Sequence, residues 1–264
     1  MTSNEVSLIV QKMTPSFGQA LPKHFSAEKY TRIALTAIRK NPKLAQCDQA
    51  SLLGSLMMFA QLGLEPNTPL GHAYLVPFRN KGQYEVTPII GYKGALDLAY
   101  RTGLYEVIDA HPVYSSDEFD YAYGFDEFLK HKPQGKRDGK PTHYYAFYKL
   151  KGGGRRFRVW THDECIAHGK KYSKSFANGP WSTNEKAMCL KTVIKDLLSY
   201  APMSAEEKQT WSIANMEGGI VKASIENPQE IEATFENPKL IEAENKSEEK
   251  KLNETNEQLK ELGL

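Results

Sequence analysis

The sequence predicts an α+β fold, in which a small antiparallel β-sheet with hairpins is braced by helices and followed by a polar C-terminal tail. Apolar residues recur at helical spacing between about residues 26 and 63. They then form strand-like runs between about residues 72 and 160, and return to helical spacing before residue 202. Helices and strands therefore occupy separate blocks of the chain, which is typical of α+β domains rather than of α/β domains.

Two helices are expected in the first block. The first begins after Ser26, a residue type that caps helix N-termini, and ends before Asn41-Pro42, since a residue that precedes proline disfavours helical dihedrals. The second begins near Asp48 and ends at Gly63, because glycine readily adopts the left-handed conformation that closes a helix.

The strand block starts with a hairpin. Residues 72–79 and 83–90 are two β-like runs, and the Asn80-Lys81-Gly82 segment between them is a hairpin signal. A short helix is expected at residues 92–102. Further strand candidates are residues 105–114, 121–128, 143–150 and 155–160, the last two joined by a glycine-rich loop.

Three capping boxes of the form S/T-x-x-E mark the return of helices. They begin at Thr161, Ser182 and Ser204, and each reads as the start of a helix. The helix that follows the second box is expected to stop at Pro202.

The composition changes at about residue 216. Two copies of a ten-residue unit begin at Glu226 and Glu236, too few and too polar to build a solenoid. Residues 225–264 carry eleven acids and five bases, a net of −6, whereas the rest of the chain carries +8. We therefore expect a core at 1–215 and an acidic, flexible tail at 216–264 that serves as a linker or a short partner-docking motif.

The composition also excludes some protein classes. No apolar run approaches the ~20 residues that span a bilayer, and residues 1–13 lack the pattern of a signal peptide. The three cysteines, Cys47, Cys165 and Cys189, are odd in number and far apart. This favours reduced, intracellular thiols over a disulfide framework.

Residues 130–174 combine positive charge with aromatic rings. They hold thirteen lysines and arginines against three acids, a net of +10, together with seven aromatic residues. Cations that neutralise phosphates and rings that stack on bases together favour a nucleic-acid surface. The alternative is a solvated hairpin whose rings face the core. On either interpretation, strand alternation predicts Phe157 in the core and Arg156 and Arg158 on the surface.

The chain offers few candidates for catalysis. It contains no G-x-x-x-x-G-K-[ST] segment, so we expect no ATP-driven motor. Asp117, Glu118 and Asp120 allow one alternative function, a Mg²⁺-dependent DNA nuclease. Acids in a polar turn are more often turn formers, and these stand beside no lysine at motif spacing.

A metal site is not expected either. His162, Cys165 and His168 recur three apart on a predicted helix, but a structural zinc site needs four ligands, and a solvated helix face explains this spacing better.

Longer motifs resemble a known family. The segments QLGLEP at 61–66, GHAYLVPF at 71–78 and IIGYKG at 89–94 follow one another in the order seen in the phage and prophage RecT family, and PW at 180–181 and KTVI at 191–194 agree with its later part. The RecT family comprises single-strand annealing proteins related to Redβ. The resemblance covers about residues 20–205 and not the tail.

The resemblance implies ATP-independent binding of single-stranded DNA and annealing of complementary strands in phage recombination. It implies a homo-oligomer, as a ring or helical filament, that holds DNA backbones in a basic groove, with the annealed duplex as an intermediate. Expected partners are a cognate phage exonuclease and the host single-strand-binding protein. We expect no enzymatic activity, cofactor or membrane association, and a location in the host bacterial cytoplasm.

The candidate DNA-binding residues follow from this resemblance and from the charge pattern. Gly91 and Gly94 allow close backbone approach at a helix start whose exposed N-terminus can receive a phosphate, with Lys93 adding charge; the alternative is a tight turn with Tyr92 in the core. The candidates are Arg79, Tyr92, Lys93, Arg101, Lys149, Arg155, Arg156, Arg158, Lys191 and Lys195. No catalytic or metal-binding residue is assigned, and the sequence leaves open which face of the 143–160 hairpin meets DNA.

Overall fold

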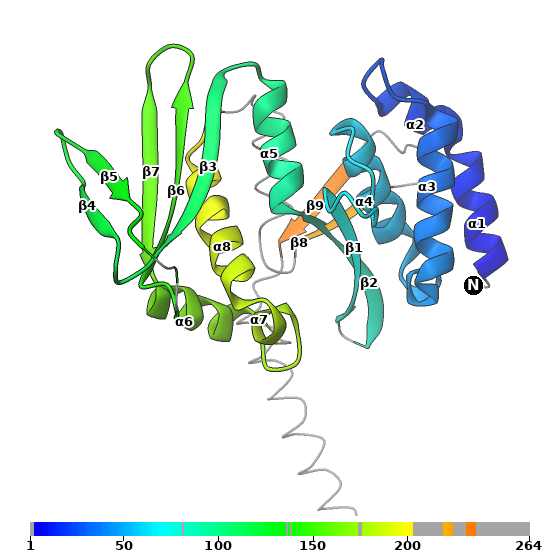
Figure 1. Ribbon diagram of the computed structural model, residues 1–264. Helices are drawn as coiled ribbons and strands as arrows, with labels where there is room; N and C mark the ends of the chain where they lie inside the picture. Colours follow the sequence, from blue (N-terminus) through cyan, green and yellow to red (C-terminus); the bar gives the residue numbers. More distant parts are fainter. Residues whose placement is uncertain are drawn as a thin grey trace, which may run out of the picture. The chain divides into compact units, whose positions relative to one another are not determined.

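The computed structural model describes residues 3–80, 82–135, 137, 139–173, 176–202, 219–223 and 231–235. It mixes helices with small antiparallel sheets, which confirms the predicted α+β class. The chain divides into two compact units (Figure 1): residues 1–91 with 206–264 form unit 1, and residues 92–205 form unit 2.

The helices of unit 1 surround a buried central helix, α4 (Gln49–Gln61). Every residue of α4 from Ser51 to Ala60 is buried. The Asp48 carboxylate caps α4 by accepting from the Ser51 N–H at 2.8 Å, as the sequence predicts. The other helices are α1 (Ser3–Lys12), α2 (Thr14–Ala20), α3 (Ala27–Lys40) and the short 3₁₀ helix η1 (Pro42–Gln46), of which the sequence analysis had identified only α3.

Strands β1 (Ala73–Asn80) and β2 (Gln83–Ile90) form the expected hairpin against α4. Backbone groups of β2 hydrogen-bond to the start of α4. The Val86 N–H donates to Ser51 Oγ at 3.0 Å, and the Tyr84 carbonyl accepts from the Asp48 N–H at 2.7 Å. Helix and hairpin are therefore fixed in register.

A second strand pair completes unit 1. Strands β8 (Gly219–Ala223) and β9 (Ile231–Phe235) are antiparallel, and β8 lies beside α4 and β2. The sequence analysis predicted a linker here. Strand β9 begins at the Ile-Glu-Ala of the first ten-residue unit, whose short polar pattern gave no strand signal.

Unit 2 is built on a three-stranded antiparallel sheet in the order β3-β6-β7. Its strands are β3 (Tyr105–Val113), β6 (His143–Leu150) and β7 (Arg155–Thr161). A separate hairpin consists of β4 (Glu118–Ala122) and β5 (Phe128–Lys132), where the sequence analysis had expected one strand at 121–128. The helices are α5 (Tyr92–Arg101), α6 (His162–Tyr172), α7 (Pro180–Thr183) and α8 (Glu185–Ser199).

The predicted capping boxes have different outcomes. The box at Thr161 is present at the start of α6: Thr161 Oγ1 accepts from the Glu164 N–H at 3.2 Å, and Glu164 Oε2 accepts from the Thr161 N–H at 2.8 Å. The box at Ser182 is wrong. Pro180 starts the short helix α7 one turn earlier, so Ser182 lies inside α7 and donates to the Gly179 carbonyl, and α8 begins after Asn184. The box at Ser204 lies outside the described residues.

Helix α8 covers one face of the sheet of unit 2. Tyr144 and Tyr148 of β6 pack on this face with Val193 and Leu197 of α8, and all four side chains are buried. Helix α8 ends at Ser199, close to the predicted stop at Pro202. Within the described ranges, no helix is long and apolar enough to cross a membrane.

We predict that Gly91→Ala destabilises unit 1. A Cβ atom at Gly91 would lie 2.2 Å from the backbone carbonyl oxygen of Gly71, so the backbone would have to move. The expected cost is about 1–3 kcal/mol of unfolding free energy, typical of overpacking. Thermal unfolding followed by circular dichroism measures it. Gly152→Ala is the matched control, because no atom lies within 4 Å of its added Cβ, and equal melting temperatures for the two variants would contradict the prediction.

Candidate nucleic-acid interface

The sheet of unit 2 has two different faces. Strand alternation places Tyr145, Phe147 and Lys149 of β6 on the face opposite α8. The β4–β5 hairpin lies over this face: the Phe119 ring stacks on Tyr145 with centroids 5.7 Å apart, and Tyr123 stacks on Phe157 at 5.0 Å. We call this side of the sheet the hairpin face.

The hairpin is fixed to the sheet edge as well as to its face. Strand β7 is one of the two edge strands of this sheet, and the N–H of Val159 donates to the Tyr123 hydroxyl at 2.9 Å. A side chain thus satisfies an edge N–H that would otherwise be available to pair with another strand.

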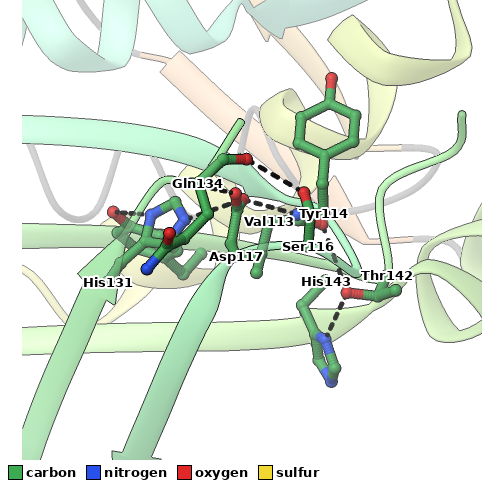
Figure 2. Close-up of polar contacts among 9 residues, drawn as sticks. Val113, Tyr114, Ser116, Asp117, His131, Gln134, Thr142 and His143 are labelled. Carbon is green, nitrogen blue, oxygen red and sulfur yellow. Dashed lines mark hydrogen bonds and ion pairs between the residues drawn. The ribbon is translucent and has the colours of Figure 1, made fainter. Parts of the chain in front are cut away.

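Asp117 anchors the base of the hairpin. Its carboxylate accepts from the N–H groups of Tyr114 (2.8 Å) and Gln134 (2.9 Å) and from His131 Nε2 (3.1 Å), and its side chain has no exposed surface. Figure 2 shows these three contacts converging on one carboxylate. The Tyr114 and Gln134 N–H groups, in that order, lower the pKa of Asp117 from 3.8 to about 2, against the effect of burial.

The same chain of hydrogen bonds reaches the sheet through His131. Because the Asp117 carboxylate only accepts, His131 Nε2 donates to it, and in the neutral ring Nδ1 accepts from the Tyr145 hydroxyl at 3.0 Å. Burial raises the pKa of Tyr145 to about 12, so its hydroxyl keeps the proton that it donates. The Asp117–His131–Tyr145 relay therefore joins the turn before β4 to β5 and β6.

A groove of about 370 Å³ opens on the hairpin face between β5 and the loop ends of β6 and β7. Phe128 of β5, which is 42% exposed, and the half-buried Phe147 of β6 contribute aromatic surface to it. Lys149 and Arg155 lie directly opposite each other across β6 and β7, and both are exposed. We call this site the aromatic groove. Arg156 and Glu127 line it as well. The groove therefore offers flat rings beside three cations and one acid, and rings beside cations are the combination that receives single-stranded nucleic acid.

The rings of the basic stretch are mostly buried, as expected. Phe157 is buried under the rings of the hairpin. Tyr144, Tyr145 and Tyr148 are buried too, whereas Phe147 and Trp160 are half-buried and Tyr172 is exposed.

Arg156 and Arg158 lie on the other face of β7, toward α8, as alternation predicted. Arg156 is exposed. Arg158 has partners within unit 2: its Nε lies 3.5 Å from Asp196 Oδ2, and its guanidinium carbon lies 4.4 Å from the Tyr200 ring centroid. A phosphate at Arg158 would have to compete with these contacts. Strand alternation thus divides these candidates between the two faces of the sheet, with Lys149 and Arg155 on one and Arg156 and Arg158 on the other. Arg156 lies near the loop end of β7 and also lines the aromatic groove.

Lys191 and Lys195 lie one turn apart on α8, and both are half-buried. Burial lowers the pKa of Lys191, and burial together with repulsion from Lys191 lowers the pKa of Lys195 to about 8. Two like charges in a partly desolvated position are costly without an anion nearby. The pair is therefore a candidate phosphate contact.

The remaining candidates lie at the start of unit 2 and in unit 1. Helix α5 begins at Tyr92 as predicted, with Tyr92 half-buried and Lys93 exposed at its first turn. Arg101, in the last turn, pairs with Asp97. Arg79 is exposed on β1 in unit 1. DNA contact by all ten candidates remains a prediction.

The nuclease alternative receives no support from the geometry of its acids. Asp117 is a turn former whose oxygens are already hydrogen-bonded. Glu118 lies within 3.4 Å of Lys130 Nζ and 3.9 Å of Lys132 Nζ. Among the described residues, no group of three or more histidines, cysteines or acids is arranged to hold a metal ion.

The sequence pattern predicts one strand at 121–128 where the structure has the two strands β4 and β5. The aromatic groove beside β5 was therefore not predicted. A signal was present: Glu118 and Asp120 of β4 face Lys132 and Lys130 of β5 in register. Acids and bases at alternate positions of two neighbouring segments are typical of paired strands.

We predict that Asp117→Asn lowers stability at neutral pH and that its effect disappears in acid. An amide cannot accept both backbone N–H groups and the His131 N–H as well as the carboxylate does, so the cost near pH 7 should be about 1–3 kcal/mol. Because the pKa is depressed in the folded state, this stabilisation is complete above the unfolded pKa of about 3.9 and is lost as the pH falls toward 2.

Urea unfolding between pH 7 and pH 2 measures this difference. The matched control is Asp120→Asn, an exposed acid on β4, the strand that begins directly after Asp117. If the gap between Asp117→Asn and the wild type stays constant down to pH 2, the carboxylate is not the stabilising group.

Comparison with known proteins places the chain in context. A family model described as "RecT family" matches residues 28–232. The match continues past the expected limit at about residue 205 and includes β8 and the first residues of β9.

Two relatives also align over most of the chain. The chain is 42% identical over 220 residues to "Protein RecT" of Escherichia coli (strain K12), covering 81% of each protein. It is 30% identical over 203 residues to "Uncharacterized protein YqaK" of Bacillus subtilis (strain 168), covering 77% of this chain and 65% of that protein.

Proposed function

Because this chain belongs to the RecT family of recombination proteins, we propose that it binds single-stranded DNA and anneals complementary strands without nucleotide hydrolysis. The observation that carries this proposal is the aromatic groove, in which the exposed Phe128 ring and the half-buried Phe147 ring lie beside the Lys149–Arg155 pair. Rings and cations together are the features that bind single strands without sequence preference.

The groove suits annealing in particular. A ring that stacks on the flat face of a base leaves the Watson–Crick edge free, and a cation that holds a phosphate carries no sequence information. A strand held in this way can test a second strand by base pairing. The pairing energy then drives the reaction, so no hydrolytic site is required.

We also propose that several copies act together along one strand. The β4–β5 hairpin ends in Phe125, whose side chain is fully exposed. An apolar ring at the tip of a hairpin is a suitable contact for another subunit. A ring or helical filament of subunits would keep the strand extended over many nucleotides.

Protein partners are the last part of the proposal. The acidic residues beyond Phe235 are the candidate docking segment for a cognate exonuclease and the host single-strand-binding protein. Truncations of this segment should begin after Phe235, because β8 and β9 belong to unit 1.

Annealing of labelled complementary oligonucleotides tests the proposal. The protein should produce duplex in EDTA without ATP, faster than the strands pair alone. Shortened strands in Mg²⁺, absent with Asp120→Ala, would instead support the nuclease.

The aromatic groove is tested by the double variant Lys149→Ala/Arg155→Ala. Its affinity for an oligo-dT strand should fall, and the slope of log K against log salt should become less negative by about 1.4, or about 0.7 for each phosphate that the variant no longer neutralises. Lys130→Ala/Lys132→Ala is the control with the same charge change, since these exposed lysines face Glu118 on the outer side of the hairpin. Equal salt slopes for the two double variants would show that DNA does not bind in the aromatic groove.

The α8 lysines give a prediction about pH. If Lys195 contacts a phosphate, affinity for oligo-dT should weaken between pH 7 and pH 9, because its pKa of about 8 means that the free protein loses this charge in that range. Lys195→Arg keeps its charge and should flatten the profile. Fluorescence anisotropy at constant ionic strength measures the pH profiles of the wild type and of Lys195→Arg, with Lys93→Arg as an exposed lysine control. Parallel profiles for Lys195→Arg and the wild type would exclude Lys195 as a phosphate contact.

A further inference from the structure

We propose that unit 1 carries a second binding site for the backbone phosphates of a DNA strand, in a groove along α3. This inference rests on the proposed function and adds to it a site that lies outside unit 2. The groove has a volume of about 390 Å³ and runs between α3 and the loop at residues 66–69. We call it the α3 groove.

One stripe of α3 supplies the positive wall of this groove. Lys29, Arg32, Thr36 and Lys40 all line it, at spacings of three, four and four residues. These spacings place the four side chains on a single side of a helix. The opposite side of α3 carries Tyr30, Ala34 and Ile38, which are buried in the core, so the cationic stripe faces outward.

The charges of the stripe are only partly neutralised. Lys29 Nζ lies 2.6 Å from Glu65 Oε1 and is therefore paired. The Glu28 carboxylate, one helical turn before Arg32, accepts a hydrogen bond from the Ser26 hydroxyl at 2.7 Å. Arg32 and Lys40 are exposed, and neither lies within ion-pair distance of a carboxylate in the part of the chain that the structure describes. The groove thus keeps two cations for an external anion.

The loop that forms the other wall is held rigidly. Asn67 has the left-handed φ of 54°; its N–H donates to the Ala73 carbonyl at 2.9 Å, and its side-chain oxygen accepts from the Leu75 N–H at 2.9 Å. The loop therefore presents a fixed surface to α3, with the acceptor oxygen of Asn67 already used.

Beside it, the hydroxyl oxygen of Thr68 is buried without a hydrogen-bond partner among the described residues. A buried hydroxyl without a partner is costly, and an acceptor entering the groove would relieve that cost. Arg32 and Lys40 can only donate and the Thr68 hydroxyl can donate, so a ligand that supplies acceptor oxygens, as a phosphate does, matches all three groups.

The spacing of the cations favours a strand over a free anion. Arg32 and Lys40 are eight residues apart, which is roughly 12 Å along the helix at 1.5 Å per residue. A single phosphate ion cannot contact both cations, whereas successive phosphates of one extended strand can. Ile33, Ala37, Pro66 and Pro69 line the groove between them and offer apolar surface to the sugars.

The test compares two double variants with the same charge change. Arg32→Ala/Lys40→Ala removes the groove cations, and Lys12→Ala/Lys43→Ala removes two exposed lysines of unit 1 that do not line the groove. The salt slope of oligo-dT binding should become less negative by about 1.4 in the first double and change little in the second. Arg32→Lys/Lys40→Arg should restore the wild-type slope.

A local readout accompanies this comparison. Bound oligo-dT should protect Lys40, and not Lys43, from acetylation in the wild-type protein, as quantified by mass spectrometry. Equal slopes for the two doubles, or unprotected Lys40, would overturn the α3 groove while wild-type binding still upheld the proposed function. Equal protection of Lys40 by millimolar inorganic phosphate would replace the strand site with a free-anion site. Absence of wild-type oligo-dT binding would instead refute the proposed function itself.

Discussion

The alternation of side chains along β6 is the constraint on which unit 2 depends. Successive residues of this central strand point to opposite faces, so Tyr144 and Tyr148 pack against α8 while Tyr145, Phe147 and Lys149 face the hairpin. A slip of one residue would exchange the two sets. It would bury Lys149 against α8 and remove Tyr145 from His131. The core and the aromatic groove are therefore specified by one register.

The hairpin face needs a second device, because a two-stranded hairpin alone is marginally stable in water. Ring stacking buries apolar surface between the hairpin and the sheet, but stacked rings can slide past each other and do not fix the position of the hairpin. The Asp117–His131–Tyr145 relay adds directional hydrogen bonds, in which each ring nitrogen of His131 has a different partner, and the Asp117 carboxylate is closed to solvent. This explains why the one strongly acidic group in a region considered for catalysis acts as a structural anchor.

Positive charge in this protein serves different purposes at different places. Arg158 pairs with Asp196 and stabilises the packing of α8 on β7, whereas Lys149 and Arg155 remain exposed beside aromatic rings. Lys191 and Lys195 remain partly buried near each other, which is unfavourable in isolation. The excess of +10 in residues 130–174 is thus not a uniform surface. The proposed strand binding would draw on the cations that have no partner within the described chain, on α8, on the hairpin face and along α3.

The sequence by itself determined the elements that depend on local signals. Ser26, Asp48 and Thr161 cap helices through hydrogen bonds within four residues, and β1 pairs with β2 as a hairpin. These three helix starts and the hairpin were predicted. The family followed from long motifs. Only the tertiary structure decided the rest. It paired β8 with β9, packed the β4–β5 hairpin on β6, and linked Asp117 to Tyr145 through His131. These outcomes depend on contacts between residues far apart in sequence, whose energies no local pattern of residues encodes.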